Sequence, residues 1–271
     1  MLDPFGRTIN YLRVSVTDRC NLRCTYCMPR EGVPSLPHEA ILSYEAIRDF
    51  VRLAVTYGIG KVRLTGGEPL VRRGVVTLVE QLARIEGVTD LAMTTNGTLL
   101  DLYAEALAQA GLHRVNISLD SLSPERYSAI TRGGDVRQAL SGIDAALVAG
   151  LTPVKLNCVV ENVADEGDGA SPDAQAVAAY GRGRGLEVRF IRKMNIAQGQ
   201  FWVVEGGTGG HCELCNRLRL SSDGWLRPCL FNDVRFNIRE LGYANALEQA
   251  VAHKPQCGSA SLANRMHAIG G

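Results

Sequence analysis

Residues 11–27 read YLRVSVTDRCNLRCTYC, and this stretch decides the fold. Its first half is rich in β-branched and apolar residues, which predicts a strand over 12–17. Its second half is a C-x3-C-x2-C motif at Cys20, Cys24 and Cys27, directly after that strand. Three thiols in one short loop suit a four-iron cluster that keeps one iron open. Zinc is the alternative, although closed zinc sites use four ligands.

The chain beyond this stretch alternates short apolar runs with amphipathic segments. Five further strands are predicted, over 61–65, 90–95, 114–119, 153–160 and 187–194. A helix is predicted over 43–58, because its apolar residues recur at 3.6-residue spacing behind the capping residue Ser43. Six β-α units in series predict a parallel sheet with right-handed crossovers. Because six units are fewer than the eight of a closed barrel, we expect an α/β fold with an open, partial β/α barrel.

Two stretches interrupt this alternation and predict the domain organisation. Residues 161–174 are polar, acidic and rich in turn formers, which predicts a solvated loop. Residues 198–210 end in EGGTGG, which predicts a flexible link. We therefore expect a core domain over 1–197 and a small C-terminal lobe over 198–271.

Composition and charge restrict the classes of partner. The chain has 271 residues with 46% hydrophobic and 21% charged side chains, and its formal charge is +1. These values predict a globular protein without the basic field that would attract nucleic acid or an anionic membrane. The N-terminal residues do not form a secretion signal, and no apolar run approaches the ~18 residues of a membrane span. A cytoplasmic protein without a disulfide framework is expected.

A second cysteine triplet lies in the predicted C-terminal lobe, with the spacing Cys212-x2-Cys215-x13-Cys229. From spacing alone, half of a zinc ribbon is an open alternative to a cluster, with a fourth ligand from His211, His253 or Cys257. Behind its first two cysteines, Arg217 and Arg219 stand two residues apart and would point to the same side of an extended segment. Two guanidinium groups on one side would clamp a phosphate.

The first triplet together with TGGEP at residues 65–69 resembles the radical S-adenosylmethionine superfamily. In that superfamily the open iron binds S-adenosylmethionine, which is then cleaved to a 5′-deoxyadenosyl radical. Longer motifs resemble one family within it, the GTP 3′,8-cyclases of molybdenum cofactor biosynthesis. These motifs are FGR-x3-YLRVSVTDRCNLRCTYCMP, KVRLTGGEPLVRR, MTTNG, VNISLDSL, CELCNRLRLSSDGWLRPCL and the terminal IGG.

The resemblance implies a role for each matching residue. The two cysteine triplets would each hold a [4Fe–4S] cluster, and the second cluster would bind the guanine ring. The S-adenosylmethionine site would be lined by Tyr26, Gly67, Ser118 and Met194. The nucleotide would be bound by Arg13, Lys61, Arg63, Thr94, Lys155, Arg189, Arg217 and Arg219. Catalysis would further involve Arg13 and the C-terminal pair Gly270 and Gly271, which would enter the active site.

The implied activity is a lyase reaction that converts GTP to 3′,8-cyclo-7,8-dihydro-GTP. The implied partners are GTP and an electron donor, and the next enzyme of the pathway and a second copy of the chain are further candidates. One departure from the family is that only 17 residues separate Met194 from Cys212, where the family has a longer stretch. Two alternatives therefore stay open. One is a radical enzyme with an auxiliary cluster that acts on another nucleotide or a peptide, and the other is a non-catalytic metal-binding module.

Overall fold

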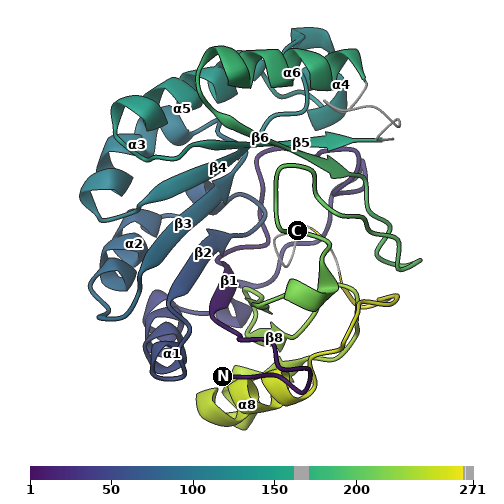
Figure 1. The fold of residues 1–271 in the computed structure, drawn as a ribbon. Coiled ribbons are helices and arrows are strands. Elements are labelled where there is room, and N and C mark those ends of the chain that lie inside the picture. The colour runs from purple at the N-terminus through teal and green to yellow at the C-terminus, as the bar shows by residue number, and fades with distance from the viewer. Residues whose placement is uncertain (162–170, 265, 267–271) are drawn as a thin grey trace.

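The computed structural model describes residues 1–161, 171–264 and 266. Within them, nine strands form one sheet in the order β6-β5-β4-β3-β2-β1-β7-β8-β9. Every pair from β6 to β7 is parallel, and β8 and β9 are antiparallel additions at one end. The sheet curves, and helices cover its outer face (Figure 1). This arrangement confirms the open, partial α/β barrel.

The strand bounds agree with the six predicted strands to within two residues at each end. The strands are β1 Tyr11–Ser15, β2 Lys61–Thr65, β3 Asp90–Thr95, β4 Arg114–Ser118, β5 Lys155–Val160, β6 Glu187–Arg192, β7 Arg217–Leu220, β8 Trp225–Arg227 and β9 Phe236–Asn237. The start of β5 differs from its predicted start at residue 153. Pro153 has no amide hydrogen to donate, so the ladder begins beyond it, at Lys155.

Four of the six helices of the barrel begin behind a residue whose side chain caps the helix. They are α1 Tyr44–Thr56, α2 Val75–Ala83, α3 Leu100–Gln109, α4 Pro124–Thr131, α5 Val136–Val148 and α6 Pro172–Gly183, with short 3-10 turns η1 His38–Ala40, η2 Pro69–Val71 and η3 Cys212–Leu214. Ser43 caps α1 by accepting a hydrogen bond from the amide of Ala46 at 3.1 Å. The face of α1 that carries Ile47 and Phe50 is fully buried against the sheet, as its spacing predicts.

The predicted loop over 161–174 is wrong at its C-terminal end, because α6 already begins at Pro172. Ser171 caps this helix by accepting a hydrogen bond from the amide of Ala174 at 3.2 Å. A serine followed by proline is also a helix start, and here that role overrides the reading as a turn. Residues 162–170 lie outside the described part of the chain.

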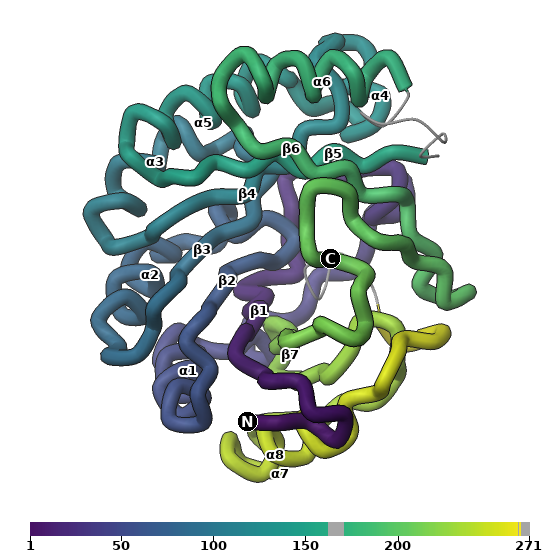
Figure 2. Tube along the Cα trace, viewed as in Figure 1, coloured from purple at the N-terminus to yellow at the C-terminus, as the bar shows by residue number. Residues whose placement is uncertain are grey.

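The C-terminal segment continues the barrel sheet. Strand β7 pairs in parallel with β1, so the first strand of the chain lies between β2 and β7 (Figure 2). Two further helices follow, α7 Ile238–Leu241 and α8 Tyr243–Ala252. The buried face of α8 belongs to the same hydrophobic core as the barrel strands. The domain boundary after residue 197 stays a prediction, while the two parts share one sheet and one core.

Residues 198–210, predicted as a flexible link, pack against β6 instead. Glu205 forms a β-bridge with Phe190 of that strand. A side chain at Gly206 would begin 2.6 Å from the carbonyl oxygen of Val188, and one at Gly210 would begin 2.2 Å from that of Trp202. These two glycines therefore permit close backbone packing.

No helix among the described residues is long and apolar enough to cross a membrane.

Candidate active site

The first cysteine loop is held by the glycine-rich loop that follows β2. The amide of Gly67 donates to the carbonyl oxygen of Thr17 at 2.8 Å, and the amide of Glu68 donates to that of Arg19 at 2.8 Å. A side chain at Gly67 would begin only 2.2 Å from the carbonyl oxygen of Arg19. Glycine is therefore required for the backbone to approach the residue that precedes Cys20.

The three thiols of this loop lie close enough together to interact electrostatically. Burial raises the pKa of Cys24 to about 12, with further contributions from Asp120 and from the thiols of Cys27 and Cys20. Burial followed by Cys20 also raises the pKa of Cys27 to about 12. A cationic metal cluster would relieve this crowding of thiolates, because a coordinated thiol loses its proton. The donor set thus fits an iron–sulfur cluster.

Two buried carboxyl groups flank this loop, and sequence reasoning did not assign them a role. Glu68 is 1% exposed and accepts hydrogen bonds from the Thr95 hydroxyl at 2.8 Å and the Asn96 amide at 2.7 Å. Burial raises the pKa of Glu68 to about 7. Its bonds join the loop after β2 to the end of β3. The signal for Glu68 was its position in the TGGEP motif.

The second carboxyl group, Asp120, lies beyond the end of β4. The Tyr26 hydroxyl donates to its Oδ2 at 2.7 Å, and the Val159 amide donates to its Oδ1 at 2.8 Å. Burial raises the pKa of Asp120 to about 6. The cysteine loop, β4 and β5 are therefore joined through this one carboxylate. The sequence feature that could have indicated Asp120 is the VNISLDSL motif, from which only Ser118 was assigned a role.

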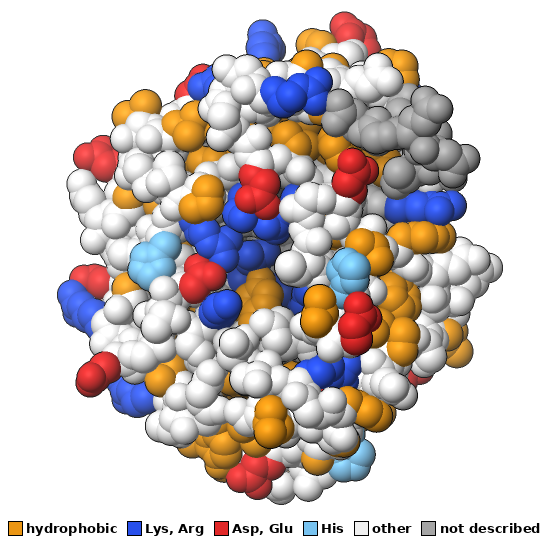
Figure 3. All heavy atoms as spheres, in the orientation of Figure 1, with side chains coloured by type: hydrophobic (Ala, Val, Ile, Leu, Met, Phe, Trp, Pro, Cys, Tyr) orange, Lys and Arg blue, Asp and Glu red, His pale blue; other side chains and the backbone are white. Residues whose placement is uncertain are grey.

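A cavity of about 340 Å³ opens inside the barrel, and eight basic side chains and one carboxylate, Asp90, line it. The basic residues are Arg13, Lys61, Arg63, Arg114, Lys155, Arg189, Arg217 and Arg219. Figure 3 shows basic side chains gathered in a central hollow of this face. Seven of the eight are predicted substrate ligands, so the fold brings almost all of that set together. The exception among the predicted ligands is Thr94, which is not part of this lining.

Three arginines of the cavity lining form a row across neighbouring strands. In the sheet register Arg13 of β1 stands opposite Arg63 of β2 and Arg219 of β7. Arg13 and Arg219 are each 7% exposed. Burial, followed by the nearby Arg217, lowers the pKa of Arg219 to about 10. Buried like charges are unfavourable together, and a polyphosphate is the kind of ligand that would offset them.

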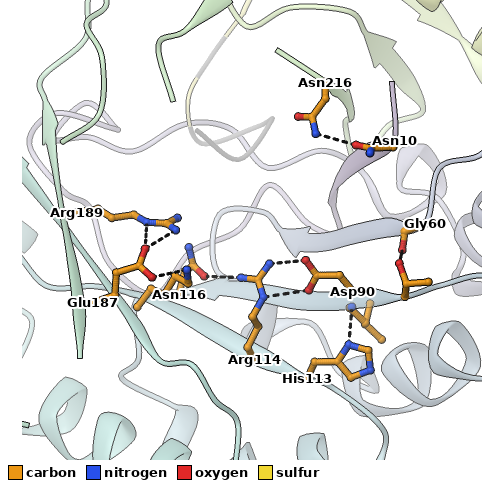
Figure 4. A network of polar contacts seen from close by, with 12 residues as sticks. Asn10, Gly60, Asp90, His113, Arg114, Asn116, Glu187, Arg189 and Asn216 are labelled. Carbon is orange, nitrogen blue, oxygen red and sulfur yellow. Dashed lines mark hydrogen bonds and ion pairs between the residues drawn. The ribbon is translucent and has the colours of Figure 1, made fainter. Parts of the chain in front are cut away.

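Three other cations of the cavity lining, on β4, β5 and β6, form ion pairs with carboxylates. Glu187 accepts a hydrogen bond from Lys155 at 2.5 Å. It accepts another from Arg189 at 2.7 Å (Figure 4). Arg114 forms a two-pronged ion pair with Asp90, with N–O distances of 3.0 and 2.6 Å. Sequence reasoning missed Glu187, which stands opposite Lys155 in the observed register of β5 and β6.

A second cavity of about 560 Å³ adjoins the first. Met194 lines both, and Tyr26 lines the second cavity together with Arg192 and Trp202. Tyr26 and Met194, both predicted to contact S-adenosylmethionine, therefore share one cavity next to the basic one. Gly67 and Ser118 line neither of the two cavities. Gly270 and Gly271 lie outside the described residues.

The second cysteine triplet lies in the wall of the basic cavity. Cys212, Cys215 and Cys229 all line it. The amide of Phe231 donates to the Cys229 sulfur at 3.4 Å. In the first triplet, the sulfur of Cys20 accepts an equivalent hydrogen bond from the amide of Leu22. Such bonds orient and tune ligand sulfurs in iron–sulfur proteins.

The three candidates for a fourth ligand differ in their contacts. The thiol of Cys257 lies 2.9 Å from that of Cys212. His211 contacts Glu213, and His253 contacts the carbonyl oxygen of Gln249. Within the described ranges, no three His, Cys, Asp or Glu side chains converge as ligands of a single metal ion would. A four-iron cluster does not require such convergence, because its thiolates bind different irons.

Comparison with known proteins first defines the class. Residues 14–166 match the Radical SAM superfamily. The structure of Streptococcus suis SuiB bound to its precursor peptide SuiA has a TM-score of 0.61 at 15% identity, covering 93% of this chain and 66% of that one. Native anSMEcpe with bound AdoMet has a TM-score of 0.54 at 19% identity, covering 70% of this chain and 53% of that one. This chain thus spans about two-thirds and one-half of these proteins, and at such identities the likeness shows the fold alone.

Curated relatives then define the family. The GTP 3′,8-cyclase of Petrotoga mobilis is 42% identical over 94% of this chain and 94% of its own length. Those of Moorella thermoacetica and Listeria welshimeri are 42% and 38% identical, over 93% and 94% of this chain and 90% of their own length. The chain belongs to the GTP 3′,8-cyclase family of the radical SAM superfamily. The Petrotoga alignment spans 307 positions against 271 residues here, so the relative has residues that this shortened chain lacks.

Proposed function

We propose that this chain converts GTP to 3′,8-cyclo-7,8-dihydro-GTP, the first step of molybdenum cofactor biosynthesis. The observation that supports this function best is the row of Arg63, Arg13 and Arg219 in the cavity whose wall carries the second cysteine triplet. A triphosphate is the group that such a row would bind. A metal-coordinating triplet in the same cavity would then lie within reach of the nucleotide base.

The residues present fit both implied cofactors. Cys20, Cys24 and Cys27 would hold the first cluster, and Tyr26 and Met194 would contact S-adenosylmethionine in the adjoining cavity. When bound, these cofactors supply a 5′-deoxyadenosyl radical that takes hydrogen from C3′ of GTP. An external electron donor is required as a partner, and a second copy of the chain or the next enzyme remains a further prediction.

The chain's own contribution is to bind and orient the nucleotide. Arg13, Arg63 and Arg219 would fix the triphosphate at the β7-β1-β2 side of the cavity. Lys155 and Arg189 share one carboxylate, Glu187, so this part of the site keeps a net positive charge but carries an acceptor beside its donors. It therefore suits the polar groups of the sugar or base as well as phosphate. Fixing the two reacting centres in this way replaces a bimolecular encounter by an oriented one.

The decisive experiment uses GTP deuterated at C3′. The protein is reconstituted anaerobically with iron and sulfide, then supplied with S-adenosylmethionine, a reductant and the labelled GTP. We expect deuterium in the 5′-deoxyadenosine and a cyclised nucleotide that separates from GTP by chromatography. Cleavage of S-adenosylmethionine without deuterium transfer and without a new nucleotide would refute the proposal. The matched control is GTP deuterated at C2′, which should transfer no label.

A further inference from the structure

Lys254 is a buried lysine that neither the sequence motifs nor the cavity lining singled out. It follows α8 and is 3% exposed. Its ammonium group donates to the carbonyl oxygen of Arg217 at 2.8 Å and to that of Pro228 at 2.7 Å. No carboxylate of the described chain forms an ion pair with it. A buried ammonium group without a carboxylate is unusual, and a negatively charged neighbour of another kind would stabilise it.

The negative partner is the second cysteine triplet. Arg217 stands two residues after Cys215, and Pro228 directly precedes Cys229, so Lys254 joins the two halves of the motif. An ammonium group has three N–H donors. Two of them bind these carbonyl oxygens, and the same group interacts with the thiol of Cys215. One side chain therefore orders the ligand loops and brings a positive charge to their sulfurs.

Arg7 provides an internal comparison. Its guanidinium donates to the carbonyl oxygens of Cys212 at 2.6 Å, Gln256 at 2.9 Å and Pro255 at 2.6 Å. It therefore also fastens the segment after Lys254 to the triplet. Its charge, however, is paired with Asp3 at 2.5 Å. Arg7 thus contributes backbone anchoring with a compensated charge, whereas Lys254 contributes anchoring and an uncompensated one.

We propose that Lys254 is a positioning residue of the C-terminal iron–sulfur site, which orders Cys215 and Cys229 and makes the bound cluster easier to reduce. The inference rests on the proposed second cluster. Hydrogen bonds and net charge near the sulfurs are main determinants of cluster potential. A fixed positive charge favours the more negative, reduced state, so its removal lowers the midpoint potential.

Three substitutions separate the positioning role from the role of the charge. Lys254→Met removes charge and donors at similar length, Lys254→Gln keeps donors without charge, and Lys254→Arg keeps both. Each is made in a protein whose Cys20, Cys24 and Cys27 are replaced by alanine, so that only the C-terminal cluster forms. The control is the double variant Asp3→Asn with Arg7→Met, which loosens the same segment without changing the net charge.

Iron content and a redox titration followed by electron paramagnetic resonance are measured after anaerobic reconstitution. We expect Lys254→Met to lose iron and to shift the midpoint potential of any retained cluster to more negative values. Lys254→Gln should retain more iron than Lys254→Met and show the same shift in potential. Lys254→Arg should keep the potential of the parental protein, in which only Cys20, Cys24 and Cys27 are replaced. An unshifted midpoint potential in Lys254→Gln, or an equal shift in the Arg7 control, would overturn the proposal for Lys254 and leave the C-terminal cluster site itself intact. Absence of a cluster in the parental protein would instead refute the C-terminal cluster site and this inference with it.

Discussion

The two cysteine triplets present equal numbers of thiols in opposite electrostatic surroundings. Around the first, Asp120 adds to burial in raising the pKa of Cys24, and Glu68 does so for Cys20. At the second, burial alone would raise the pKa of Cys215, but Lys254 and Arg217 outweigh it and lower that pKa below its usual value. Spacing thus sets the number of ligands, whereas burial and the neighbouring charges together set how readily each ligand ionises. At Cys229 burial prevails and raises the pKa, so the effect of the basic neighbours is largest at Cys215.

The largest expected effect separates the two sites by the reaction that each supports. Cys20→Ala should abolish cleavage of S-adenosylmethionine, because the first cluster cannot form with two thiolates. Cys215→Ala should retain uncoupled cleavage while losing conversion of GTP. Both products are measured in the same anaerobic assay. The comparison fails if Cys215→Ala abolishes cleavage as completely as Cys20→Ala does.

The next effect concerns the basic cavity beside the second triplet. Removal of a buried, charge-assisted contact costs about 1.5–3 kcal/mol, so Arg219→Ala should weaken GTP binding about 10- to 150-fold. Binding of S-adenosylmethionine should change little. Calorimetry on the reconstituted protein measures both affinities. Arg84→Ala, which removes an exposed arginine paired with Glu80, is the matched control, and an equal GTP affinity in both variants would contradict the clamp.

A third effect tests the difference in ionisation directly. In cluster-free protein at pH 7, Cys215 should react with iodoacetamide at least about tenfold faster than Cys24 or Cys27, because the thiolate is the nucleophile. The pKa of Cys24 and Cys27 is about 12, so their rates should rise about tenfold per pH unit between pH 7 and 9. The rate at Cys215 should level off at a lower pH than the rates at Cys24 and Cys27, because its pKa is lowered. Peptide mass spectrometry measures the alkylation rates of all three thiols. Equal rates would contradict the predicted difference in ionisation between the two triplets.

The smallest effect concerns the hydrogen bond between Tyr26 and Asp120. Burial raises the folded-state pKa of Asp120 to about 6, above its unfolded value, so this group makes stability fall as pH rises toward 6. Tyr26→Phe removes a donor to the charged form, which should lower the free energy of unfolding by about 1–3 kcal/mol above pH 6 and by less at pH 5. Urea unfolding of cluster-free protein measures this loss. Tyr57→Phe, which loses only an exposed bond to Glu248, should change stability little at either pH.

Local signals in the sequence were sufficient for the barrel. Ser43 caps the helix that its position predicts, and the six predicted strands coincide with the short apolar runs of the sequence. The register between distant strands was not accessible, because no local signal pairs β7 with β1. The sheet register that places Arg13 opposite Arg219 is therefore seen only in the structure. For the same reason Glu187, Asp120 and Lys254 were missed, since their importance depends on neighbours far along the chain.

The position of β1 between β2 and β7 also has a consequence for synthesis of the chain. Strand β1 emerges early from the ribosome, but the strand that covers its second edge lies in the C-terminal part of the sequence. Until β7 arrives, the nascent barrel carries an open edge of unpaired backbone groups, which is a site for aggregation. The C-terminal segment thus protects the newly made chain, and this role is separate from its thiols.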